Sequence, residues 1–203
     1  MARIGVTLNE VLRDFLGQLT YTYEKYIKET DIEEGTITEF DLMKYFNFES
    51  VDEMNKFIYD EAALEIFGHA DQTDNNLMNK FNMFHMDIKD DEEHEIEIVS
   101  REVNKSIPST LFFLSKLSCR AEKIRFVKNY DEYWDNIDVL ITANPIALES
   151  KPEGKLSIKI NTSYNKDSKS DFELDSIIEF MTDEDLREKI LNTKITTYEE
   201  IDD

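Results

Sequence analysis

The sequence predicts an α/β fold in which a parallel sheet lies between helices. Short apolar runs at residues 4–6, 123–127 and 138–145 are typical of buried strands. The first run passes directly into a helical pattern at residues 11–19, and residues 94–117 combine a strand, a polar turn and an amphipathic helix. Strands that alternate with helices indicate a parallel sheet, because parallel strands need crossover connections.

The end of the first strand is the first candidate site. The apolar run at residues 4–6 stops at residues 7–10, and the helical pattern follows without a long loop. In open α/β folds, the carboxyl ends of strands are where ligands and chemistry are found. The side chains of Thr7 and Asn9 stand at this position.

Residues 2–15, with the sequence ARIGVTLNEVLRDF, resemble motif I of the haloacid dehalogenase-like (HAD) phosphohydrolases. The resemblance is to the small 5′(3′)-deoxyribonucleotidase-like members found in bacteria and phages. Their motif runs from an apolar strand through Asp, any residue, Asp, Gly and Val. On this alignment Thr7 takes the position of the nucleophile and Asn9 that of the general acid/base, so both aspartates are replaced.

Later segments resemble the other HAD motifs. Ser100 takes the place of the Ser or Thr that hydrogen-bonds the transferring phosphoryl group in motif II. Lys128, directly after a short strand, takes the place of the motif III lysine. The run DVLITANP resembles motif IV, in which Thr142 and Ala143 replace the pair of acids that holds Mg²⁺. The segment from Lys151 onward resembles the next core strand and the turn that follows it.

The resemblance implies a HAD-like Rossmannoid three-layer sandwich with a parallel central sheet and an inserted helical cap. Residues 1–15 and 93–203 are the predicted core. Residues 16–92 are the predicted cap region, which follows the first strand. In the family such a cap covers the catalytic cleft and selects the substrate.

Three local patterns refine this prediction. Ser50, with Glu53 three residues on, predicts the capped start of a helix that ends at Gly68. Met78, Met83, Phe84 and Met86 favour packing of the cap on the core, with an adaptable contact patch as the alternative. Apolar spacing at residues 171–181 predicts a helix.

The replacements remove the charge that HAD chemistry requires. That chemistry uses one Asp as nucleophile, a second as general acid/base, and carboxylates that hold Mg²⁺. A threonine hydroxyl needs an adjacent base, and the amide of Asn9 does not accept a proton at neutral pH. We therefore predict no catalytic residue, no metal and no cofactor, and interpret the six motif positions as degenerate.

Acids elsewhere near the motifs offer an alternative. Glu10 and Asp14 follow the first strand, and Asp135 and Asp138 flank the motif IV strand. Glu10 takes the position of the motif's glycine and Asp14 falls on the following helix. We therefore expect neither side chain to point where the replaced acids pointed. Catalysis by a relocated acid is accordingly the less favoured hypothesis.

The composition limits the partners. The 203 residues include 45 acidic and 23 basic ones, for a net charge of -22. Such a chain is repelled by nucleic acids and anionic membranes, whose binding depends on Lys and Arg. An acidic exterior fits either plain solvation or a basic protein partner. The single cysteine, Cys119, excludes an intramolecular disulfide, and the three histidines lack metal-binding spacing.

The predicted function is that of a catalytically inactive HAD-like protein. We expect a structural or protein-interaction component, whose partners are other proteins or further copies of itself. The kinship with phage members suggests a virion (neck or tail) or assembly protein. Without a signal region or an apolar span, the expected location is the cytoplasm or a virion. Two alternatives remain: a Mg²⁺-dependent phosphatase or 5′-nucleotidase with a relocated acid, and a nucleotide-sensing pseudoenzyme that uses Ser100 and Lys128.

Overall fold

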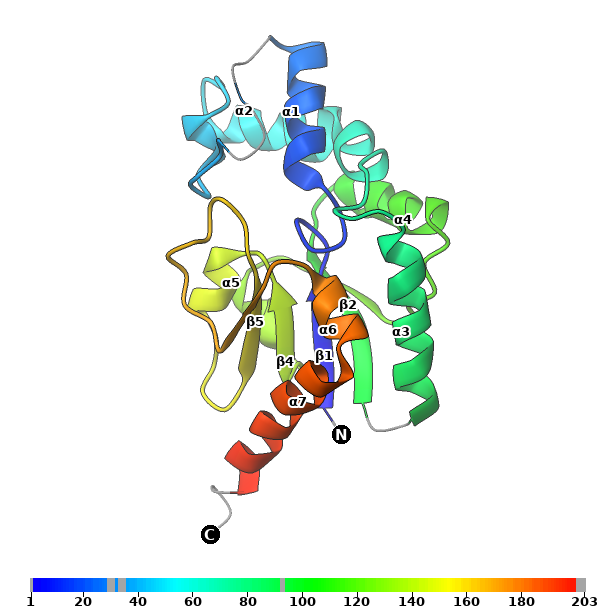
Figure 1. The fold of residues 1–203 in the computed structure, drawn as a ribbon. Coiled ribbons are helices and arrows are strands. Elements are labelled where there is room, and N and C mark those ends of the chain that lie inside the picture. The colour runs from blue at the N-terminus through cyan, green and yellow to red at the C-terminus, as the bar shows by residue number, and fades with distance from the viewer. Residues whose placement is uncertain (1, 29–31, 33–35, 92–93, 200–203) are drawn as a thin grey trace.

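The computed structural model describes residues 2–28, 32, 36–91 and 94–199 (Figure 1). Within these residues one parallel sheet has the strand order β3-β2-β1-β4-β5-β6. Its strands are β1 Ala2–Thr7, β2 His94–Arg101, β3 Ile124–Val127, β4 Val139–Thr142, β5 Leu156–Ile160 and β6 Phe172–Leu174. The α-helices are α1 Phe15–Tyr26, α2 Val51–Lys56, α3 Leu77–Asp91, α4 Ser106–Lys116, α5 Pro145–Glu149, α6 Ile177–Thr182 and α7 Glu184–Glu199. Shorter helical turns are Leu42–Lys44, Phe57–Glu61, Leu64–Gly68 and Asp131–Trp134.

The predicted α/β class with a parallel central sheet is confirmed. The chain builds outward from β1 to β2 and β3, and then returns to the other side of β1 for β4, β5 and β6. This order is that of a Rossmann-like doubly wound sheet. The direction of winding reverses between β1 and β4, and at such a reversal the carboxyl ends of the strands leave a crevice.

Helical elements cover both faces of the sheet, and the strand residues alternate between them. Ile4 and Val6 of β1 belong to the apolar cluster that includes α3, α6 and α7. Gly5 lies on the opposite face, where Ile137 packs so closely that a Cβ on the glycine would come within 3.0 Å of its Cδ1. A side chain at position 5 would therefore displace Ile137, which belongs to the second cluster of the sheet.

An insertion between β1 and β2 forms its own aromatic core above the carboxyl edge of the sheet (Figure 1). Its buried residues run from Phe15 to Phe67, with Tyr23 in edge contact with Phe46, Phe48 and Phe57. The apolar residues of α3 instead join the cluster of the sheet. The contacts thus place α3 with the sheet, although the sequence put it in the cap region. The predicted boundary at residues 92–93 lies outside the described residues.

Local structure follows the predicted signals in part. Ser50 caps α2, and its Oγ accepts a hydrogen bond from the Glu53 amide at 3.1 Å. The helix predicted from residue 11 begins at Phe15 instead, because residues 8–13 form tight turns on the Leu8 carbonyl. The segment predicted as a helix at residues 171–181 contains the short strand β6 before α6.

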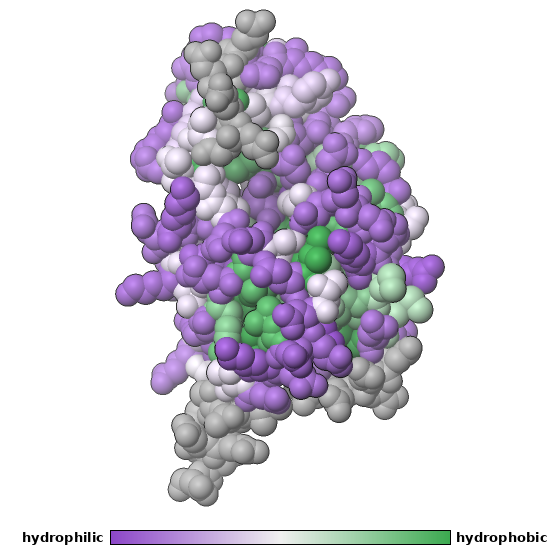
Figure 2. All heavy atoms as spheres, in the orientation of Figure 1, coloured by the Kyte–Doolittle hydropathy of each residue, from purple (hydrophilic) through white to green (hydrophobic). Residues whose placement is uncertain are grey.

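The exterior is predominantly hydrophilic. Figure 2 shows polar residues over most of one face, with hydrophobic residues gathered in small areas in the lower half of the view. Of the four residues proposed as a Met-rich patch, Met78 and Phe84 are buried in the sheet cluster. Met83 and Met86 are exposed on α3. Packing against the core therefore accounts for half of this group.

Candidate functional site

A cavity of about 360 Å³ lies at the carboxyl edge of the sheet, between the sheet and the insertion. Thr7 and Asn9 after β1, Ser100 and Arg101 at the end of β2, and Asn144 after β4 line it from the sheet. The insertion supplies mainly apolar and aromatic side chains, with Tyr59 among them. This is the position at which a doubly wound sheet binds ligands.

The predicted motif I and motif IV positions meet at this edge. The Thr7 hydroxyl donates a hydrogen bond to Oγ1 of Thr142 at 3.1 Å, and both side chains are buried. Oγ1 of Thr142 also accepts a hydrogen bond from the amide of Asn144, which caps α5. The carbonyl of Ala143 accepts a hydrogen bond from Asn165 at 2.9 Å. These groups therefore connect β1, β4 and the turn after β5.

The side-chain oxygen of Asn9 is hydrogen-bonded to the guanidinium of Arg13. Nε and Nη2 of Arg13 both donate to the Asn9 Oδ1, at 2.9 and 2.6 Å. The tight turn at residues 8–13, in which Glu10 has a φ of 59°, brings the two side chains together. The Asn9 oxygen, at the predicted general acid/base position, thus faces a guanidinium.

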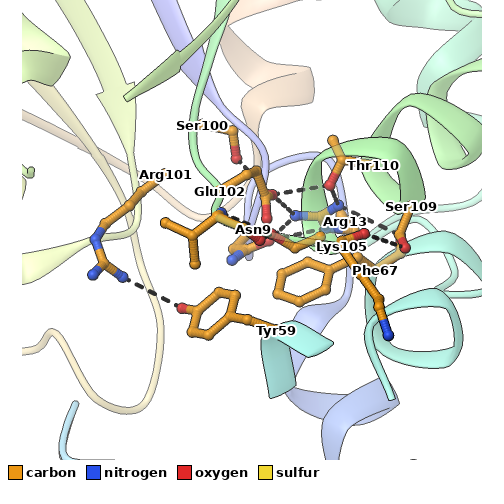
Figure 3. Close-up of polar contacts among 12 residues, drawn as sticks. Asn9, Arg13, Tyr59, Phe67, Ser100, Arg101, Glu102, Lys105, Ser109 and Thr110 are labelled. Carbon is orange, nitrogen blue, oxygen red and sulfur yellow. Dashed lines mark hydrogen bonds and ion pairs between the residues drawn. The ribbon is translucent and has the colours of Figure 1, made fainter. Parts of the chain in front are cut away.

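Arg13 forms a fully buried ion pair with Glu102, the residue that follows β2 (Figure 3). The Nη2–Oε1 distance is 2.6 Å and both side chains have no exposed surface. Thr110 of α4 bridges the two, accepting from Arg13 Nη1 at 2.7 Å and donating to Glu102 Oε1 at 3.0 Å. Ser100, the predicted motif II position, also donates to Glu102 Oε1 at 3.0 Å.

Aromatic rings enclose this network. The Arg13 guanidinium centre lies 4.9 Å from the ring centroid of Phe67 in the insertion and 5.5 Å from that of Phe113 in α4. Arg13 also donates to the Phe67 carbonyl at 3.4 Å. Oε1 of Glu102 takes all the hydrogen bonds, and its buried Oε2 has no hydrogen-bond partner among the described residues. The network therefore fastens the insertion to β1, β2 and α4.

These donor groups do not fit Mg²⁺. The two threonine hydroxyls bond to each other, and the Asn9 oxygen is taken by Arg13. Mg²⁺ needs hard oxygen ligands in octahedral geometry, usually with one or two carboxylates. Among the described residues, no group of three or more His, Cys, Asp or Glu side chains is arranged to hold a metal ion.

Glu10, which was expected not to point where the replaced acids pointed, lines the same cavity as Thr7 and Asn9. Its Oε1 accepts a hydrogen bond from the Leu16 amide at 2.8 Å. Desolvation is the main cause that raises the pKa of Glu10 to about 7, and nearby Asp14 adds to it. A carboxyl with this pKa exists in both protonation states near neutral pH.

Arg101 and two tyrosines form a second polar group at the cavity wall. Arg101 Nη1 donates to the Tyr59 hydroxyl at 3.4 Å, and Figure 3 shows these side chains pointing toward one another. The Arg101 amide donates to the Tyr133 hydroxyl at 2.9 Å. Burial raises the pKa of Tyr59 to about 12 and raises that of Tyr133 further. Both phenols therefore keep their protons at physiological pH.

The remaining predicted residues lie away from the cavity. Lys128 is exposed and does not line it, and its carbonyl accepts a hydrogen bond from Arg101 Nε. Asp138 pairs with Arg3 at the opposite, amino-terminal edge of the sheet. Asp14 caps α1 by accepting a hydrogen bond from the Gly17 amide. Asp135 precedes β4 and is likewise absent from the cavity lining.

Sequence reasoning missed the residues with the most contacts here. A lone arginine among apolar residues at positions 11–15, and an acid directly after the apolar strand of Ser100, were the available signals. Neither reveals that Arg13 and Glu102 pair, because they are 89 positions apart. Nothing in the sequence marked Tyr59 and Arg101 as site residues, since tyrosine and arginine are common near the ends of helices and strands.

Comparison with known proteins does not assign the chain to a family. No protein-family model matches the sequence, and no curated protein matches it either. In the part of the chain that the structure describes, every helix is too short or too polar to traverse a lipid bilayer. The function is therefore inferred from the site itself.

Proposed function

We propose that this chain is a HAD-like protein with an inserted cap that no longer hydrolyses phosphate esters. It acts as a structural or interaction component. One observation carries the proposal: the groups at the predicted catalytic positions are hydrogen-bonded within the protein. Thr7 pairs with Thr142, Asn9 binds Arg13, and Ser100 binds Glu102.

The chemistry of Arg13 supports this role. The Arg13 guanidinium binds Asn9, the predicted general acid/base position, and is enclosed with Glu102 away from solvent. Breaking such a pair to free either group is costly, because a lone buried charge is left behind. The strand order and the insertion between β1 and β2 agree with the HAD-like arrangement.

The acidic exterior supports the interaction role. With a net charge of -22, the chain attracts basic protein surfaces and repels polyanions. We propose that its partners are other proteins or further copies of the chain, and a virion or assembly role is the corresponding setting. Sedimentation of the purified chain alone, and pull-down with salt washes, test whether a partner binds in fixed proportion.

The direct test of lost hydrolysis is phosphate release. Purified wild-type protein is incubated with Mg²⁺ and a panel of deoxynucleoside monophosphates, and free phosphate is measured. We expect no release above that of buffer. Release that a chelator abolishes would contradict the proposal and restore the phosphohydrolase reading.

Glu10 favours a second candidate, a hydrolase with a relocated acid. Its carboxyl lines the cavity, and its pKa of about 7 suits a general acid or base at neutral pH. If the wild type releases phosphate, the variant Glu10→Gln shows whether Glu10 or another group is responsible for the activity. A large loss would assign the activity to Glu10, and an unchanged rate would exclude this residue.

A further inference from the structure

We propose that the cavity at the carboxyl edge is a binding site for a small aromatic carboxylate, anchored by Arg101. This goes beyond the proposed function, because it assigns a ligand class to the cavity. The cavity of about 360 Å³ falls within the usual size of small-molecule sites. Its lining joins apolar walls to a few convergent polar groups, as such sites do.

Arg101 is the anchor. Among the described residues that line the cavity, it is the one cationic side chain. Nε donates to the Lys128 carbonyl and Nη1 to Tyr59, which fixes the plane of the guanidinium. Nη2 donates to no described acceptor. A guanidinium held in this way presents donors that match the two oxygens of a carboxylate.

Two phenols complete the polar end. The hydroxyls of Tyr59 and Tyr133 each accept a hydrogen bond from Arg101. Neither phenol proton has an acceptor among the described residues, and the Tyr133 side chain is 95% buried, since its exposed fraction is 5%. A buried donor without a partner is unfavourable, and a ligand oxygen in the cavity would satisfy it.

The charge of the cavity disfavours a dianion more than a monoanion. Glu10 and Asp41 line the cavity with Arg101, so carboxyl groups outnumber the cation. A phosphate monoester carries a charge of about -1.5 to -2 at neutral pH and would face one guanidinium and two carboxyl groups. Like charges placed together oppose binding. A single carboxylate brings one negative charge to Arg101 rather than nearly two, so Glu10 and Asp41 oppose it less than they oppose a phosphate monoester.

The aromatic side chains that line the cavity favour a ligand with a planar ring. Phe40 lies with its ring centroid 5.7 Å from that of Tyr164 and 6.3 Å from that of Tyr130. All three rings line the cavity, together with aliphatic side chains of the insertion. Aromatic rings pack favourably against one another in offset or edge-to-face arrangements. An aromatic ring attached to the carboxylate would therefore contact these walls.

Titration calorimetry at pH 8 tests the proposal. The probes are 4-hydroxybenzoate and phenylacetate, the neutral 4-hydroxybenzamide that is isosteric with the first, acetate, and dAMP. We expect the two aromatic carboxylates to bind wild type at least about tenfold more tightly than the other probes. Arg101→Gln should weaken that binding about tenfold or more, because it removes a charge-assisted contact. Arg120→Gln, a surface arginine outside the cavity lining, should leave it unchanged.

A milder variant covers the case in which Arg101→Gln does not fold. Tyr59→Phe retains the ring stacked on Phe67 and removes one donor, so binding should weaken severalfold. Three results would overturn the proposal. These are no binding of either aromatic carboxylate to wild type at millimolar concentration, tighter binding of dAMP than of both, and unchanged binding in every folded cavity variant.

Discussion

Two groups of charged side chains lie beneath the insertion, and they are used differently. Arg13 and Glu102 have no exposed surface and bond to each other and to Thr110. Glu10 and Arg101 line a cavity instead. The first group joins β1, β2, α4 and the insertion, whereas the side chains of the second group face the cavity.

The difference shows how one sheet edge serves two purposes. A charge buried with its partner contributes to a unique arrangement only while both partners remain, because removing one leaves an uncompensated charge. A charge at a cavity wall is not enclosed with a buried partner in this way, so changing it should disturb the fold less. Substitutions of Arg13 or Glu102 should therefore lower the free energy of unfolding much more than substitutions of Glu10 or Arg101, although the two groups lie close together.

The largest effect is expected for Arg13→Met. It leaves the Glu102 carboxylate buried without a counter-charge, and the free energy of unfolding should fall by about 3–5 kcal/mol. Urea denaturation followed by circular dichroism measures this. The double variant Arg13→Met with Glu102→Leu should recover much of the loss, since both charges are gone. A loss below about 1 kcal/mol in the single variant would show that the pair does not hold the insertion.

Thr110→Val should have a smaller effect. The change keeps the shape and removes one acceptor for Arg13 and one donor to Glu102. Hydrogen bonds to charged groups contribute more than neutral ones, so we expect a loss of about 2 kcal/mol. Ser109→Ala is the matched control, because that hydroxyl donates to the Lys105 carbonyl within the same helix region. Equal losses in both variants would argue against a special role for the bridge.

Glu10→Gln tests the charge at the cavity wall through the pH dependence of the free energy of unfolding. The folded pKa of about 7 lies above the ordinary value of 4.5, so folding favours the protonated carboxyl. This contribution is fully present below about pH 4.5 and is lost as the pH rises through 7. Relative to wild type, the variant should gain about 1–2 kcal/mol on going from pH 4.5 to pH 8, with partial solvent screening considered. Parallel stability curves at both pH values would refute the raised pKa.

Local signals in the sequence were sufficient for much of the fold. Apolar runs located β1, β3 and β4, the strand–turn–helix pattern from residue 94 located β2, and Ser50 with Glu53 located the start of α2. The strand β5 was expected only from the family resemblance. The strand β6, with three residues, was too short to stand out from the helix that follows it. The tight turn after β1 was missed because an apolar spacing at Val11 and Leu12 imitates a helix, although both residues pack on the sheet.

The sequence by itself determined the α/β class, the order of the strands along the chain and the acidic exterior. These depend on residue type and on spacing over short distances. Only the tertiary structure decided that Arg13 pairs with Glu102, that Glu10 enters the cavity, and that α3 packs on the sheet. Each of these depends on which segments come together in space, and residue spacing along the chain does not encode such long-range contacts.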